Sequence, residues 1–193
     1  MARTATFNRE EILHKVMRAF WERGYEATGM AEILRITGLN PGSIYAAFGS
    51  KQGLFLAALD LYGDFSQAAV ERQLAAHSHP LEAIRALFRD LAATVAGPAG
   101  KRSCFLVNSA LEIGRHDKAA RKLIQAHFQS IEELLRTVLI RAREEGYLAP
   151  DKDPHALAAT LMVMLWGLRV LGTTHPHPEQ TGRIVAQVLT LLE

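Results

Sequence analysis

The sequence has a single cysteine, Cys104, among 193 residues. No internal disulfide is therefore expected, which agrees with a reducing compartment. Long hydrophobic runs are also lacking: the longest nearly uncharged apolar stretch, Ala156 to Leu168, is shorter than the ~20 residues that span a bilayer, and the N-terminus has no apolar signal core. We therefore expect a cytoplasmic protein with no membrane partner.

An excess of charge is nearly absent as well. The formal net charge is +2, from 22 Lys and Arg against 20 Asp and Glu. The whole excess lies in residues 1–51, which hold seven basic and five acidic side chains. Such a small net charge does not by itself indicate a nucleic-acid-binding protein. A DNA-binding function must therefore depend on where a few basic side chains and backbone N–H groups point.

Apolar residues recur at helical spacing along the chain, with no strand alternation, internal repeat or low-complexity tract. The first helix is expected to begin near Asn8, with Glu11 as the partner in a capping box, and to end near Gly24. Further helices are expected over residues 30–37, from Pro41, over 51–76, 80–96, 104–113 and 117–145, after Asp153-Pro154 and from about Pro178, with an exposed loop over 97–102. The fold class is therefore all-α.

Two of these helices meet at a very short turn. Gly38 is a left-handed stop for the 30–37 helix, and Asn40 caps the next helix, whose first position suits Pro41. A turn made of Gly38, Leu39 and Asn40 is typical of a DNA-binding helix-turn-helix. The outer face of the second helix then carries Pro41, Gly42, Ser43, Tyr45 and Ala46.

A longer pattern surrounds this turn. Its parts are Gly24-Tyr25-Glu26-Ala27-Thr28, Ala31-Glu32-Ile33, Thr37 to Tyr45, Phe48-Gly49-Ser50-Lys51 and Leu54-Phe55. In order and spacing this pattern resembles the TetR/AcrR family signature, and the segment Ser103 to Glu112 is similar to one AcrR-like subgroup. The resemblance implies about nine helices, with a helix-turn-helix DNA-binding domain in residues 1–51 and an effector-binding and dimerisation domain in residues 52–193.

The resemblance also implies a function. It indicates a homodimeric, non-enzymatic repressor that binds a palindromic double-stranded DNA operator and that a small-molecule effector releases by moving the helix after Ser50. No cofactor and no metal is expected. The DNA contacts are expected from Thr28, Asn40, Pro41, Gly42, Ser43, Tyr45, Ala46 and Lys51. Since Ala46 and Ala47 stand where larger residues are common, and Ala31 where some members have arginine, methyl contacts and DNA shape are expected to contribute to recognition.

Physical chemistry supports part of this assignment. Tyr45 can donate its hydroxyl to a phosphate, and Ser43 can reach a phosphate or a base edge. Lys51 stands at a helix N-terminus, whose free N–H groups favour a phosphate. Arg3 and Arg9 are candidates for an arm along the DNA. The alternatives are a half-buried tyrosine, an ordinary helix serine, a solvated lysine and an ordinary chain terminus.

The candidate effector pocket is assigned mainly through the resemblance, because its residues lie on helices that line the cavity in that family. They are Phe88, Cys104, Asn108, His127, Met162, Trp166 and Arg169. Asn108 and Glu112 continue a polar stripe from Cys104 at helical spacing, which could equally tie helices together. Aromatic and Met residues at this spacing can also be plain core. His155, His175 and His177 form no convincing metal set.

Cys104 supports an alternative function. Lys101 and Arg102 precede it and a helix starts at it, two features that favour a nucleophilic thiolate and hence an electrophile or redox sensor. A small buried hydrophobe is the other interpretation. An enzyme using Cys104 with a histidine has no base or oxyanion motif to support it, and a helical module that does not bind DNA is also open.

The helix through Met162 and Leu168 is apolar nearly all round, so it must be covered on more than one side. We expect a second subunit to cover one of those sides, which predicts a two-fold dimer through the last two long helices.

Overall fold

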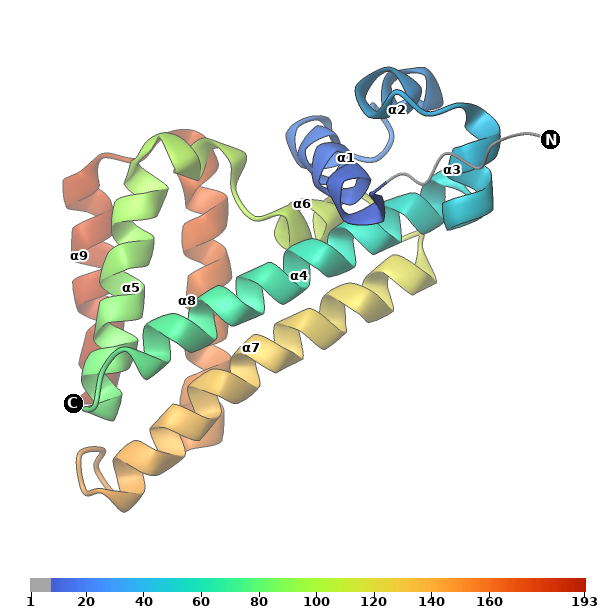
Figure 1. The fold of residues 1–193 in the computed structure, drawn as a ribbon. Coiled ribbons are helices and arrows are strands. Elements are labelled where there is room, and N and C mark those ends of the chain that lie inside the picture. Colours follow the sequence, from blue (N-terminus) through green and yellow to red (C-terminus); the bar gives the residue numbers. More distant parts are fainter. Residues whose placement is uncertain (1–7) are drawn as a thin grey trace.

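The structure is a computed structural model that describes residues 8–193, and Figure 1 shows its helices. In chain order they are α1 (Arg9–Arg23), α2 (Met30–Thr37), α3 (Pro41–Phe48), α4 (Lys51–Ala75), α5 (Pro80–Ala96), α6 (Phe105–Glu112), α7 (Lys118–Glu144), α8 (Pro154–Leu171) and α9 (Pro178–Leu189). Three short 3₁₀ turns are η1 (Pro98–Arg102), η2 (Gly172–Thr174) and η3 (Thr190–Leu192). Within residues 8–193 there are nine α-helices and no strand, which confirms the predicted all-α class.

The helix ends follow the predicted local chemistry, with two corrections. Asn8 caps α1 by accepting from the N–H groups of Glu10 and Glu11 at 3.1 and 3.3 Å. The expected return bond of a capping box is replaced, because the Glu11 carboxylate pairs with Lys15 at 2.7 Å. Within residues 97–102, expected as an exposed loop, Pro98–Arg102 instead forms η1, whose residues are exposed except for the buried Gly100.

Long α4 links the two ends of the molecule (Figure 1). It begins directly after α3, runs beside α7, and reaches the bundle of α5, α8 and α9. The helix-turn-helix therefore shares a rigid element with the bundle, and no linker separates the two.

Buried apolar side chains form two clusters. The first, which we call the head core, contains residues of α1, α2, α3 and α4. It also includes residues 104–107 at the start of α6, Ile113 and the beginning of α7. The second, which we call the bundle core, joins α5, α8 and α9 with the end of α4 and the rest of α7. The head core thus extends beyond the predicted domain boundary at residue 51, because α6 packs into it. That boundary stays a prediction.

The helix α8 is longer than the apolar run Ala156 to Leu168 counted from the sequence. With η2 it spans Pro154–Thr174, which is long and apolar enough by length and composition to cross a membrane. A single helix of this kind is weak evidence, because core helices pass the same test. Its outer face exposes Ala159, Val163, Gly167 and Val170, a stripe of small and apolar residues.

Candidate nucleic-acid interface and ligand cavity

The turn between α2 and α3 is built as the sequence predicts. Gly38 has a φ of 69°, a left-handed conformation that few other residues adopt readily. The Thr37 hydroxyl donates to the Ile33 carbonyl at 2.7 Å and accepts from the Leu39 N–H at 3.3 Å. Asn40 then caps α3 by accepting from the Ser43 N–H at 2.9 Å. These bonds hold the two short helices at a defined angle.

One face of α3 packs inward and the other is open. Ile44 is fully buried in the head core, whereas the Tyr45 side chain, one residue on, is 48% exposed. The open face has no charged side chain, so its polar side-chain groups are the amide of Asn40 and the hydroxyls of Ser43 and Tyr45. The predicted contact residues on this face are Asn40, Pro41, Gly42, Tyr45 and Ala46, which are exposed, and Ser43, which is partly exposed.

A lysine and an arginine lie beside this face, each over an aromatic ring. The Lys51 ammonium, at the start of α4, is 4.3 Å from the centre of the Tyr25 ring. The Arg9 guanidinium is 5.0 Å from the centre of the Phe48 ring. Such contacts hold a cation in place while leaving its charge available. Arg3, the other arm residue, lies outside the described residues.

The predicted role of Thr28 does not fit its position. Its side chain is fully buried, and its hydroxyl donates to the Gly24 carbonyl at 2.7 Å. A hydroxyl committed to the α1–α2 connection cannot also reach a phosphate. We therefore treat Thr28 as a residue that shapes the turn before α2.

Two other cations of the DNA-binding end, Arg23 and Arg35, are paired within the protein. Glu32 accepts from Arg35 at 2.7 Å and lies 3.4 Å from Arg23. The hydrogen bond from Arg35 holds the pKa of the Glu32 carboxyl below its usual value. Lys51 and Arg9 are therefore better placed than Arg35 to meet a phosphate.

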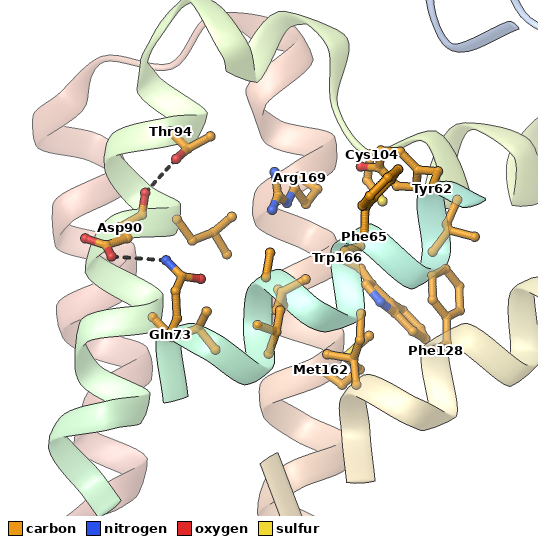
Figure 2. A pocket seen from close by; sticks show the side chains of 18 residues that line it. Tyr62, Phe65, Gln73, Asp90, Thr94, Cys104, Phe128, Met162, Trp166 and Arg169 are labelled. Atoms are coloured by element: carbon orange, nitrogen blue, oxygen red, sulfur yellow. Dashed lines mark hydrogen bonds between the residues drawn. The ribbon is translucent and has the colours of Figure 1, made fainter. Parts of the chain in front are cut away.

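A cavity of about 300 Å³ lies in the part of the chain that follows residue 51, and Figure 2 shows the side chains that surround it. Five helices contribute to its wall, so no short segment of sequence could contain it. The lining residues are Tyr62, Phe65, Ser66, Ala69, Val70 and Gln73 of α4; Leu87, Asp90, Leu91 and Thr94 of α5; Cys104 and Leu106; Phe128 and Ile131 of α7; and Met162, Leu165, Trp166 and Arg169 of α8.

Four of the seven predicted pocket residues line this cavity: Cys104, Met162, Trp166 and Arg169. The other three lie elsewhere. Phe88 is fully buried in the bundle core, because it faces the interior side of α5. Asn108 donates to the Arg102 carbonyl at 3.1 Å, which ties α6 to η1.

His127 is the third predicted pocket residue found elsewhere. Its ring packs against Gly63 of α4, and its Nε2 lies 2.9 Å from Asp60 Oδ1. A third ligand atom, from Asp64, lies within 4.8 Å of the other two. Among residues 8–193 this is the one group that could hold a metal ion by composition. The His127–Asp60 contact ties α4 to α7.

Sequence reasoning missed the α4 wall of the cavity. Tyr62, Ser66, Ala69 and Gln73 all line it. Their spacing of three and four residues places them on one helical face. That mixed polar and apolar stripe was the available signal.

The cavity wall is more apolar than polar, and its polar side chains are those of Tyr62, Ser66, Gln73, Asp90, Thr94, Trp166 and Arg169. Burial raises the pKa of the Tyr62 hydroxyl far above its usual value, and the neighbouring Cys104 thiol raises it further, so the phenol stays neutral. Asp90 is exposed and accepts from Gln73 at 3.1 Å (Figure 2). Trp166 Nε1 is buried and has no hydrogen-bond partner among residues 8–193.

The surroundings of Cys104 weaken the sequence argument for a reactive thiol. Its side chain is buried at 8% exposure, at the edge of the head core and on the cavity wall. Arg102, expected to activate it, points to α1, where it lies 3.7 Å from Glu22 and 5.3 Å from the centre of the Trp21 ring. One of the two basic residues expected to activate the thiol is therefore committed elsewhere.

At its other end, α6 contacts the DNA-binding end directly. The Glu112 carboxylate accepts from the N–H groups of Tyr25 and Glu26, each at 3.0 Å. Gly24, with a φ of 87°, lies against this carboxylate, and a Cβ there would be 2.8 Å from its oxygens. We call this contact the Glu112 clamp. The same short helix thus borders the cavity at Cys104 and holds the α1–α2 connection at Glu112.

Comparisons with known proteins agree with this arrangement. Residues 12–58 match the family model described as bacterial regulatory proteins, tetR family. Residues 80–188 match the model described as tetracyclin repressor-like, C-terminal domain.

Individual relatives match along most of the chain. It is 32% identical to the uncharacterised HTH-type transcriptional regulator YezE of Bacillus subtilis (strain 168), covering 83% of this chain and 84% of YezE. It is 28% identical to the HTH-type transcriptional repressor ComR of Escherichia coli (strain K12), covering 98% and 90%. Among solved structures, a cysteine mutant of CifR with 26-bp double-strand operator DNA matches with a TM-score of 0.87, at 29% identity and full coverage of both chains.

Proposed function

The chain belongs to the TetR family of bacterial transcriptional regulators, and from this we propose that it is a repressor that a small molecule releases from a palindromic operator. The observation that carries the proposal is the combination of an open helix-turn-helix face with a separate cavity, both bordered by α4. Proteins of this family act on double-stranded DNA as dimers, with small-molecule effectors. A DNA-binding regulator works where the chromosome lies, so we also place it in the cytoplasm.

The DNA contacts are proposed for the open face of α3 and the start of α4. The Tyr45 hydroxyl and the Lys51 ammonium are assigned to phosphates, together with the free N–H groups at the N-terminus of α4. Ser43 is assigned to a phosphate or a base edge. Asn40, Pro41, Gly42 and Ala46 supply the surface that lets the DNA backbone and bases approach.

Two structural links could pass the signal from the cavity to the DNA. The first is α4, which lines the cavity at Tyr62 and carries Lys51 at its start. The second is α6, which runs from Cys104 to the Glu112 clamp. A ligand that spreads the cavity wall would shift both helices. The helix-turn-helix units of the two subunits would then no longer match the spacing of adjacent half-sites.

The dimer interface is proposed for α8 and α9. The stripe of Ala159, Val163, Gly167 and Val170 faces outward from α8, although a helix this apolar is unfavourable in water. Small residues allow two helices to approach closely. A second copy of the chain, related by a two-fold axis, is the occupant that fits a palindromic operator.

The alternative signal is a covalent one at Cys104. Its position on the cavity wall is the observation in its favour, because an electrophile in the cavity would meet the thiol. Its burial and the commitment of Arg102 to Glu22 favour the non-covalent signal instead.

The proposal is tested by selecting genomic fragments with the full-length protein and measuring their binding in a gel shift. We expect a discrete set of fragments, and release when an effector is added. The matched control is the Tyr45→Phe, Lys51→Ala double variant, whose changes lie on the proposed DNA surface and not in the core. If the variant retained the same fragments with equal affinity, the proposed surface would be wrong.

A further inference from the structure

The polar groups of the cavity are unbalanced toward donors. Arg169 and Trp166 project into it from α8 and Tyr62 from α4 (Figure 2). The acidic group on the wall, Asp90, is exposed and already accepts from Gln73. A ligand that reaches Arg169 therefore meets N–H and O–H donors and a positive charge, while the one carboxylate of the wall, Asp90, lies on the α5 side of the cavity.

Arg169 has a charge without a carboxylate. Among residues 8–193, no acidic side chain lies within 4.0 Å of its guanidinium. Its place in the last turn of α8, where carbonyl groups favour a cation, explains in part why Arg169 has no carboxylate partner. It does not account for a guanidinium on the wall of a mainly apolar cavity, where a paired anion is the usual arrangement.

Trp166 is the second, independent observation. Its indole N–H is buried and has no partner among residues 8–193. Native proteins leave few buried donors unpaired. The ring is held against Phe128, with ring centres 4.1 Å apart, so it is not free to turn its N–H toward solvent. Three residues apart on α8, Trp166 and Arg169 lie on the same side of the helix.

We propose that the cavity binds a small amphipathic carboxylate. Its carboxylate accepts from the Arg169 guanidinium and from Trp166 Nε1, while Tyr62, kept neutral, donates from the α4 side. Its apolar body lies along Leu87, Leu91, Ile131, Met162 and Leu165. A cavity of about 300 Å³ is at the small end for ligand sites, which limits the body to one ring or a short alkyl chain.

Such a ligand is an effector only if the cavity is the effector site, as proposed above. The test therefore measures binding and DNA release separately. The probes are hydrocinnamate and octanoate, each beside its primary amide and the corresponding amine. Calorimetry with the full-length protein gives the affinities, and a gel shift with a selected fragment gives the release.

We expect each carboxylate to bind at least about tenfold more tightly than its amide, because a charge-assisted bond to arginine replaces a neutral one. The amines should bind more weakly than the amides. Arg169→Met should reduce carboxylate affinity to the amide level, whereas Arg169→Lys should keep part of the preference. Trp166→Phe should weaken carboxylate binding about threefold to tenfold. Arg72→Met, an exposed site on α4 outside the cavity, is the matched control and should change nothing.

The ligand class is overturned if amides bind as tightly as carboxylates, if no carboxylate in the panel binds at millimolar concentration, or if Arg169→Met keeps the preference. Carboxylate binding that leaves the DNA complex intact would retain the ligand class and contradict the effector role. Release of DNA by an amide but not by its carboxylate would retain the effector role and overturn the class.

Discussion

The DNA-binding end and the cavity differ in how their parts are distributed along the chain. The turn, caps and exposed face of α2 and α3 come from residues 30–48, and each depends on neighbours a few positions away. The cavity takes its wall from five helices that are spread from Tyr62 to Arg169. A site built from local interactions is visible in a pattern, whereas a site built from packing becomes visible only in three dimensions.

The largest effect on stability should come from substitutions in the two cores. The effect of these substitutions on DNA binding should then distinguish the two regions. Phe55 and Phe88 are both fully buried, the first in the head core and the second in the bundle core. Phe55→Ala and Phe88→Ala should each lower the free energy of unfolding by about 3–5 kcal/mol. Only Phe55→Ala should also weaken DNA binding, because its ring supports Tyr25, over which Lys51 lies.

Urea unfolding at one protein concentration gives the free energies, and fluorescence anisotropy under conditions where both variants are folded gives the affinities. Equal losses of DNA affinity in the two variants would mean that the regions are not energetically separable.

A smaller effect is expected at the Glu112 clamp, where the two regions meet. Glu112→Gln replaces one acceptor oxygen with a donor that faces a backbone N–H, so we expect a loss of about 1 kcal/mol at this exposed site. Effector affinity should be nearly unchanged, but saturating effector should release less DNA. The control is Glu71→Gln, an exposed glutamate of α4 with the same change of charge. Full release by the Glu112 variant would exclude α6 as a route for the signal.

The DNA-binding surface should respond in a different way. Tyr45→Phe removes one proposed phosphate bond, and we expect affinity to fall about threefold to tenfold on every sequence alike. Lys51→Ala should lower the slope of log affinity against log salt by about one. Anisotropy titrations over a salt series on a selected and a scrambled duplex measure both. Loss confined to the selected duplex would assign these residues to base readout.

Cys104→Ser should have the smallest effect. We expect slow alkylation of the wild-type thiol, because it is buried, and DNA release by a non-covalent effector should survive in the variant. Alkylation rates with iodoacetamide, beside gel shifts with and without an added electrophile, measure both. Rapid alkylation, together with a response to electrophile that the serine variant loses, would replace the non-covalent signal with the covalent one.

The same comparison explains what could be predicted from the sequence. Helix starts at Asn8, Asn40 and Asp153 were predictable because each cap bonds to an N–H two or three residues away. Pocket residues were predictable only in part. Phe88 and Met162 are both apolar residues on long helices, yet only Met162 lines the cavity, because the rotation of each helix about its axis is set by packing.

Thr28 illustrates the opposite failure. Its place in the family pattern suggested a DNA contact, but the chain turns at Gly24 and buries the hydroxyl against that residue's carbonyl. A residue in a functional motif can thus support the fold of the motif without touching the ligand. The pattern identifies the motif, and burial decides which of its members remain accessible.

The most direct test of the central claim is to sequence the genomic DNA that the full-length protein selects and to map the binding site by footprinting. The account predicts one enriched palindrome, with half-sites one or more helical turns apart and occupied by a two-fold dimer. A stable monomer, or a selection that enriches no sequence over the genomic background, would contradict it.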